Sequence, residues 1–149
     1  MAAKTKREKR AFANGDAIII QKGKILLEKR HSGKWGGYWC LPGGKLRQGE
    51  SVSAGVAREV FEETGFRVRI GKLAGIYSGK KKFRGSTSID TTFFSEITGG
   101  KERLQKEEVD ELGWFGPENL PEKLAFDHDK RIKDAFAIIG GRKRAPVIS

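Results

Sequence analysis

The sequence predicts an α/β fold in which a mixed β-sheet lies between helices. Short runs rich in β-branched and aromatic residues recur between residues 16 and 115, as expected for strands. A helical segment at residues 52–64 interrupts these runs, and an amphipathic segment follows the last of them. With 149 residues, 37% of them hydrophobic, the chain is long enough for one domain with its own core.

The first part of the chain is predicted to form a hairpin, a loop and a short strand. Residues 16–20 (DAIII) and 24–29 (KILLEK) are rich in β-forming residues, and the three residues between them favour a hairpin turn. Glycines interrupt residues 31–39, so a loop is expected there. A short strand is expected at residues 39–44 (WCLPGG).

Residues 52–64 are predicted to form a helix. Ser51 is a suitable N-cap, Gly65 provides the C-terminal stop, and no proline lies between them. The side chains expected to pack inward are those of Val52, Val56, Ala57, Val60 and Phe61.

Three glutamates of this helix indicate a metal site. Glu59, Glu62 and Glu63 stand at i, i+3 and i+4, which places them on one face. Like charges at this spacing destabilise a helix by about 0.2–0.5 kcal/mol per pair, and the helix dipole disfavours anions near the C-terminus. A hard divalent cation such as Mg²⁺ or Mn²⁺ would remove this repulsion by binding several carboxylate oxygens. The alternative is a charged face in solvent.

Strands are also predicted after this helix. Residues 67–70 and 73–77 have strand composition, and residues 88–97 (SIDTTFFSEI) form a stronger run. A charged, glycine-containing stretch at residues 98–110 then leads to a short strand at residues 111–115.

The last predicted element is an amphipathic helix after a turn between Pro117 and Pro121. Asp127 is its expected N-cap, and His128 is expected to be a first-turn residue rather than a catalyst. The apolar residues at helical spacing are Ile132, Ala135, Phe136 and Ile139.

The net charge of +11 is concentrated in three segments. Residues 1–10 and 80–84 each carry +4, and residues 142–144 carry +3. We therefore expect a basic N-terminal tail (residues 1–13), one domain (residues 14–139) and a basic C-terminal tail (residues 140–149). The tails are expected to be solvated, whereas the loop at residues 80–84 suits a phosphate-rich ligand.

The composition excludes several classes of protein. The single cysteine, Cys40, excludes an intrachain disulfide and a cysteine-cluster metal site, and we expect a small buried side chain there rather than a nucleophile. No apolar run approaches the roughly 18 residues of a membrane span. The protein is expected to be soluble and intracellular, in the cytoplasm, without membrane partners.

One stretch carries a resemblance to a known family. Gly44, five residues, Glu50, seven residues and then residues 58–66 (REVFEETGF) match a fixed pattern without departure. This pattern resembles the complete signature box of the Nudix hydrolases, and the resemblance extends over residues 14–139.

The resemblance implies a fold, a reaction and a set of metal ligands. Nudix enzymes have an α/β/α sandwich and generally cleave a phosphoanhydride bond in a nucleoside diphosphate linked to another group, with water and a divalent metal ion. Mg²⁺ is the expected cofactor, and Mn²⁺ is the alternative. The ligands implied by position are the backbone carbonyl of Gly44 and the side chains of Glu59, Glu62 and Glu63.

The resemblance leaves the general base open. Arg58 is expected to orient Glu50 or Glu59 through a charge-assisted bidentate pair. The base is Glu59 in some branches of the family and a carboxylate from a later loop in others. In this sequence the later candidates are Glu107 and Glu108, with Glu96 third.

The substrate is a small nucleotide whose identity the sequence does not fix. The candidate substrate contacts are Trp35, Tyr38, Lys45, Lys82, Phe83 and Arg84. The aromatic members of this set suit base stacking and equally suit packing. Residues 124–129 (LAFDHD) resemble a segment of the MutT-like and ADP-ribose pyrophosphatase groups. The basic loop favours a nucleoside triphosphate such as oxidised dGTP, with ADP-ribose as the alternative.

Two other classes of function stay open. The chain could be a Nudix-fold sensor that binds a nucleotide without cleaving it, although a binder would not need the complete set of glutamates. It could also be an RNA-directed enzyme that holds the RNA backbone with its basic tails, a less favoured reading. Neither the oligomeric state nor the physiological metal follows from the sequence.

Overall fold

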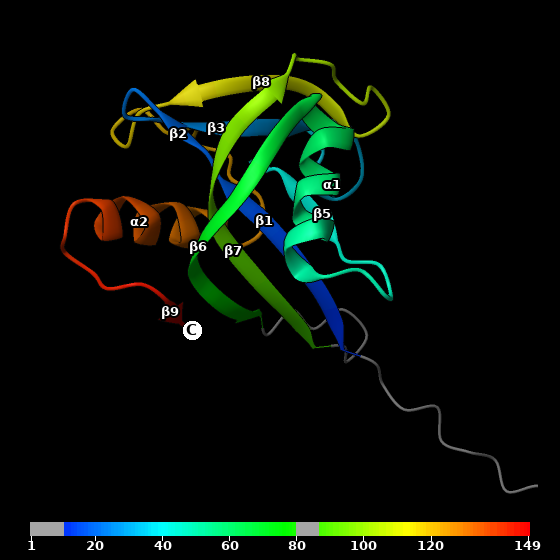
Figure 1. Ribbon diagram of the computed structural model, residues 1–149. Helices are drawn as coiled ribbons and strands as arrows, with labels where there is room; N and C mark the ends of the chain where they lie inside the picture. Colours follow the sequence, from blue (N-terminus) through cyan, green and yellow to red (C-terminus); the bar gives the residue numbers. More distant parts are fainter. Residues whose placement is uncertain (1–10, 80–86) are drawn as a thin grey trace, which may run out of the picture.

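The structure is a computed structural model that describes residues 11–79 and 87–149. Its elements in chain order are β1 (Phe12–Ile18), β2 (Ile20–Gln21), β3 (Lys24–Arg30), β4 (Trp39–Cys40), β5 (Gly43–Lys45), α1 (Val52–Thr64), β6 (Phe66–Gly79), β7 (Ser88–Gly100), β8 (Val109–Phe115), α2 (His128–Ile139) and β9 (Val147–Ile148). Figure 1 shows the strands gathered between the two helices.

The strands form two sheets. The larger is mixed, with the order β5-β1-β7-β6-β9; β1 runs parallel to β7, β6 runs parallel to β9, and the other neighbours are antiparallel. The smaller sheet is antiparallel and contains β2, β3 and β4, with β8 paired to β3. The predicted α/β class is confirmed, and the expected single sheet is divided into two.

Side chains alternate between two hydrophobic cores, one beneath each helix. Ala17 and Ile19 pack with Val56 and Val60 of α1. Ile18, which lies between them in the sequence, packs instead with Ile132 and Ala135 of α2. Because neighbouring residues of a strand point to opposite faces, both faces of this strand segment are buried. The layers are therefore helix, sheets and helix.

The helix α1 begins and ends as the sequence predicts. The Oγ atom of Ser51 accepts a hydrogen bond from the N–H of Ala54 at 3.2 Å. Gly65 adopts a left-handed conformation with φ of 81°, and its N–H donates to the carbonyl of Phe61. These caps fix the ends of the helix that carries the three glutamates.

Several predicted boundaries differ from the observed ones. The strands expected at residues 67–70 and 73–77 are one strand, β6, with irregular pairing near Ile70 and Leu73. The strand expected at residues 39–44 is interrupted and forms β4 and β5. Asp127 stands at the N-cap position of α2 but makes no side-chain capping hydrogen bond, because its carboxylate pairs with Arg131 instead.

The C-terminal segment returns to the large sheet. Val147 and Ile148 form β9 beside Gly75 and Ile76 of β6, although the sequence analysis assigned residues 140–149 to a basic tail. Lys143, one of its basic residues, pairs with Asp134 at 2.6 Å. The N-terminal tail expected at residues 1–13 and the basic loop lie largely outside the described residues. Neither helix in the described ranges is long and apolar enough to cross a membrane.

A buried ion network attaches α2 to the large sheet. Arg131 has only 3% of its surface exposed, and its guanidinium donates to Asp16 on β1 at 2.6 Å and to Asp90 on β7 at 2.7 Å. The same guanidinium lies 2.7 Å from the carboxylate of Asp127. A buried charge without partners is strongly unfavourable, so these contacts depend on one another.

Removing the positive charge of Arg131 should therefore destabilise the fold. We expect Arg131→Met to lower the free energy of unfolding by about 3–5 kcal/mol, because buried carboxylates lose their counter-charge. Urea denaturation followed by circular dichroism measures this change. The control is Arg69→Met, which breaks an exposed pair with Glu96 and should cost no more than about 1 kcal/mol. Equal losses in the two variants would contradict this account of the network.

Candidate active site

Arg58 on α1 holds the carboxylates of the predicted box in place. Its Nε donates to Glu50 Oε2 at 3.0 Å and its second terminal nitrogen donates to Glu50 Oε1 at 2.8 Å, which is a bidentate pair. The remaining terminal nitrogen donates to Glu59 at 2.9 Å and to Glu62 at 3.2 Å. One guanidinium therefore joins three carboxylates, and it bonds both of the glutamates that the sequence analysis offered as its partners.

The same contacts shift the titration of Glu50. Hydrogen bonds from Arg58, followed by the backbone N–H of Arg47 at 2.6 Å, lower the pKa of Glu50 to about 2. The pKa of Arg58 is raised in return, chiefly by its hydrogen bonds to Glu50. Both groups are therefore charged over the whole physiological pH range.

Glu59 and Glu63 lie against the two glycines of β5. A Cβ atom on Gly44 would come within 2.8 Å of the Glu59 carboxylate, so only glycine allows the backbone to approach it this closely. Glu63 accepts a hydrogen bond from the N–H of Gly43 at 3.2 Å. Two carboxylates, at i and i+4 of α1, and the backbone at Gly44 thus converge beside the edge strand.

Glu62 is directed elsewhere. It receives the Arg58 hydrogen bond, lies 3.5 Å from Arg47, and leaves 35% of its side chain exposed. The structure therefore separates the three predicted metal ligands into a pair at the glycines and one residue turned towards solvent. The metal-ligand role itself stays a prediction for all three.

A fourth glutamate, which the sequence analysis did not single out, lies beside Glu63. Glu28 on β3 is 2% exposed and Glu63 is 6% exposed. Burial, and for Glu63 also the neighbouring charge of Glu28, raises the pKa of both carboxyl groups well above the usual range. Glu28 directly follows the buried residues Ile25–Leu27 and is buried with them. Because the charged residues Lys29 and Arg30 come next, no local pattern in the sequence marked it.

These residues fit a hard divalent cation. Among the residues the structure describes, no three acidic, histidine or cysteine side chains are already arranged to hold a metal ion. However, the charge of Arg30 does not offset the burial of Glu28, and Glu28 Oε2 has no hydrogen-bond partner in the described chain. The glycine at position 44 leaves room for an oxygen-rich site against Glu59. Oxygen ligands of this kind suit Mg²⁺ or Mn²⁺.

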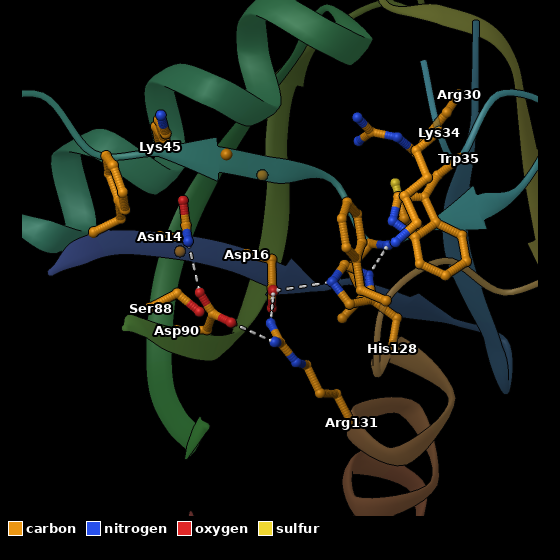
Figure 2. Close-up of a pocket in the computed structure, with 17 residues that line it drawn as sticks. Asn14, Asp16, Arg30, Lys34, Trp35, Lys45, Ser88, Asp90, His128 and Arg131 are labelled. Carbon is orange, nitrogen blue, oxygen red and sulfur yellow. Dashed lines mark hydrogen bonds and ion pairs between the residues drawn. The ribbon is translucent and has the colours of Figure 1, made fainter. Parts of the chain in front are cut away.

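A cavity of about 1030 Å³ lies on the other face of β5, towards α2. Its lining residues are Phe12, Asn14, Gly15, Asp16, Arg30, Lys34, Trp35, Cys40, Leu41, Gly43, Gly44, Lys45, Ser88, Asp90, Phe126, His128 and Arg131. Figure 2 shows Lys45 and Asn14 at one end, Trp35 and Arg30 at the other, and Asp16 between them. The glycines of β5 are common to the cavity and to the Glu59 and Glu63 site, and β5 is the edge of its sheet.

The polar floor of this cavity comes from residues far apart in the sequence. It contains the Arg131 network, and Asn14 donates to Asp90 at 2.7 Å. His128 begins α2, as expected, and its Nδ1 accepts the N–H of Leu41 at 3.0 Å while its Nε2 lies 3.8 Å from Asp16. No local pattern signals these contacts, because they join positions 41 to 115 residues apart.

The predicted substrate contacts are only partly placed in the cavity. Trp35 and Lys45 line it, and Lys45 Nζ lies 4.4 Å from the ring centroid of Phe12. Tyr38 packs edge-on against Trp35, with ring centroids 5.1 Å apart, and is not among the lining residues. The other three, Lys82, Phe83 and Arg84, lie outside the described residues.

The alternative candidates for the general base lie away from the glycines. Glu107 and Glu108 are exposed in the turn before β8, where the carbonyl of Glu108 accepts the N–H of His31. Glu96 on β7 pairs with the exposed Arg69. Within the described ranges, no hydrogen bond or ion pair joins these three glutamates to Arg58 or Glu59.

Cys40 is buried, with 2% of its surface exposed. Burial raises the pKa of its thiol to about 12. A protonated, shielded thiol is a poor nucleophile, which agrees with the packing role expected from the sequence.

Comparison with known proteins places this geometry in a family. The NUDIX domain family model matches residues 12–135. An ADP-ribose pyrophosphatase of Methanocaldococcus jannaschii is 40% identical over 80% of this chain and 69% of its own length. A MutT-like protein of Streptomyces ambofaciens is 34% identical over 86% and 78%. The crystal structure of a MutT NUDIX hydrolase from Burkholderia pseudomallei superposes with a TM-score of 0.77 at 27% identity, covering 84% of this chain and 98% of its own.

The buried acid on the cavity floor should make stability depend on pH. Burial raises the pKa of Asp16 to about 6 from a usual 3.8, so between these values the folded state holds a proton that the unfolded state has lost. The free energy of unfolding should therefore fall as the pH rises from 4 to 6, with a contribution on the order of 2–3 kcal/mol from Asp16.

Urea denaturation of the wild type and of Asp16→Asn at several pH values measures this contribution. The variant has no titrating group at this position, so its stability should fall less steeply between pH 4 and 6. Parallel curves for the two proteins would show that Asp16 does not titrate in this range.

Proposed function

The chain belongs to the Nudix family of nucleotide pyrophosphohydrolases, and from this premise we propose that it is a Mg²⁺-dependent enzyme cleaving a phosphoanhydride bond in a nucleoside diphosphate-linked substrate. The observation that carries this proposal is the set of contacts made by Arg58. Its guanidinium fixes Glu50 and Glu59, while Glu59 and Glu63 meet the backbone of Gly43 and Gly44. A protein that only bound a nucleotide would not need this arrangement.

The proposed metal ligands are the carbonyl of Gly44, Glu59 and Glu63, which lie at β5, and Glu62, which Arg58 holds on the same helix. A bound divalent ion would supply charge neutralisation for phosphate oxygens and would favour an attacking water. Glu62 supports the site by sharing the Arg58 guanidinium, and Glu50 orients that guanidinium through its bidentate pair. We propose Glu59 as the general base as well, because the later-loop glutamates make no contact with the Arg58 cluster in the described chain.

The substrate is proposed to cross the edge of β5. Because no strand of the described residues pairs with the outer side of β5, a substrate can contact the Glu59 and Glu63 face with its diphosphate and enter the cavity on the other face. Gly43 and Gly44 keep this edge free of side chains. Lys45, the next residue of the strand, lines the cavity and offers a cation to a phosphate group.

The first candidate substrate is a (deoxy)nucleoside triphosphate such as oxidised dGTP, hydrolysed to a monophosphate and pyrophosphate. The similarity to a MutT-like protein supports this candidate. The cationic side chains of Lys45, Lys34 and Arg30 along the cavity suit a highly charged ligand.

The second candidate is ADP-ribose, hydrolysed to AMP and ribose 5-phosphate. Two observations favour it: the 40% identity to an ADP-ribose pyrophosphatase, and a cavity that extends along β5 on both sides of Gly44. A substrate with bulky groups on both sides of its diphosphate would occupy both ends of this cavity.

Incubation with Mg²⁺ and an equimolar mixture of 8-oxo-dGTP and ADP-ribose, followed by chromatography, separates the candidates. Loss of the triphosphate, with pyrophosphate appearing, supports the first. Loss of ADP-ribose, with AMP appearing, supports the second. If neither compound is consumed, both candidate substrates are excluded, and the sensor and RNA-directed classes gain support. RNA affinity that weakens steeply with salt would then identify the RNA-directed class.

Glu59→Gln should abolish metal-dependent turnover without unfolding the protein. The amide keeps the shape of the side chain but loses the charge for a metal ion and the basicity for a water, so we expect at least a roughly 100-fold loss in kcat. Initial rates with the accepted substrate measure the loss, and thermal unfolding verifies the fold. Glu118→Gln, an exposed turn residue, is the matched control and should retain activity. A Glu59 variant with wild-type kcat would refute the proposed role.

A further inference from the structure

A second, open hollow lies at the C-terminal end of α1. Its volume is about 370 Å³, and it shares no lining residue with the cavity beside β5. The residues that line it come from α1, the start of β6, the end of β7 and the turn after β7: Phe61, Gly65, Arg67, Gly100, Lys101 and Arg103. The proposed hydrolysis assigns no role to any of them.

Two glycines bring the backbone segments of this hollow together. Gly65 and Gly100 adopt φ of 81° and 79°, in the left-handed region. A Cβ atom on Gly65 would clash with the carbonyl oxygen of Lys101, and one on Gly100 would clash with the carbonyl oxygen of Gly65. The N–H of Arg103 donates to the carbonyl of Thr64 at 2.8 Å. The turn after β7 is therefore fixed against the end of the helix.

This fixed backbone places three cations beside one aromatic ring. The guanidinium carbon of Arg67 lies 5.8 Å from the ring centroid of Phe61, and that of Arg103 lies 5.6 Å from it. Both arginines and Lys101 are exposed, and Phe61 is half-buried. In the described part of the chain, no carboxylate makes an ion pair with any of these three cations. The ring therefore orients two guanidinium groups whose N–H donors are available to an anion.

The shape and charge of the hollow suit one segment of a long anionic strand better than a small molecule. Sites for small molecules enclose most of the ligand surface, whereas the three cations of this hollow are exposed. Guanidinium groups bind phosphate through paired N–H donors, and aromatic rings stack on unpaired bases. The net charge of +11 would attract a polyanion over a longer range.

We propose that the hollow is a docking surface for a single-stranded nucleic acid. The ring of Phe61 stacks on one base, while Arg67 and Arg103 bind the neighbouring phosphates and Lys101 adds a third positive charge. This inference goes beyond the proposed function and does not depend on which nucleotide is hydrolysed.

Fluorescence anisotropy with a labelled single-stranded oligoribonucleotide tests this surface, in EDTA to prevent hydrolysis and over a series of salt concentrations. Each phosphate neutralised on a single strand contributes about −0.7 to the slope of log K against log salt concentration. The double variant Arg67→Gln/Arg103→Gln should therefore make the slope less negative by about 1.4, twice that value. Phe61→Leu should leave the slope unchanged and weaken binding by roughly 5- to 150-fold at fixed salt, the range of one stacking contact.

The matched control is Lys24→Gln/Lys133→Gln. It removes the same two charges from exposed positions that do not line the hollow, so the wild-type slope should be retained. Thermal unfolding verifies that each variant is folded.

Four results would overturn the proposal. The wild type could fail to bind the oligoribonucleotide, or the arginine variant could keep the wild-type slope, which would place the RNA elsewhere on the chain. An equal change of slope in the lysine control would show that only net charge matters. Displacement of the RNA by polyglutamate, together with unchanged affinity in Phe61→Leu, would identify an acidic protein as the partner instead.

Discussion

The arrangement of the candidate active site depends on one guanidinium. Arg58 places a permanent positive charge among Glu50, Glu59 and Glu62, whose carboxylates would otherwise repel one another. Its bidentate pair with Glu50 anchors it to the loop before α1, so the helix and the loop are fixed together. With Glu62 bound to this cation, Glu59 and Glu63 are the box carboxylates directed at the edge strand. The helix thus carries a strongly acidic face without losing its structure.

The second constraint is the absence of side chains at two of the three residues of β5, Gly43 and Gly44. Gly43 and Gly44 allow α1 carboxylates to approach the strand from one side, while the cavity over the Arg131 network opens on the other. One face presents the carboxylates of Glu59 and Glu63, and the other presents the cavity. The proposed site joins the two across β5, the edge strand of the sheet in the described residues.

The sequence predicted those features that short-range patterns encode. The helix caps at Ser51 and Gly65 depend on spacings within one helix, and the structure reproduces them. The Arg131 network and Glu28 beside Glu63 were not predictable in this way. Each depends on how separate elements pack, and the pairing of Asp16 with Arg131 spans 115 residues. The return of Val147 and Ile148 to β6 was missed for the same reason, because a two-residue strand has no periodicity to detect.

The parallel pairing of β1 with β7 has a consequence for how the chain folds. Asn14 lies opposite Asp90, so the centre of the large sheet closes a loop of 76 residues. Contacts between residues so distant in sequence slow folding, because chain entropy is lost before the contacts form. During synthesis β1 cannot pair with β7 until residues 88–100 have been made, whereas α1, which packs on the face with Ala17 and Ile19, is made earlier. We expect the helix that carries the predicted metal-binding carboxylates to cover one face of the first strand before the sheet closes, which would limit aggregation of the nascent chain.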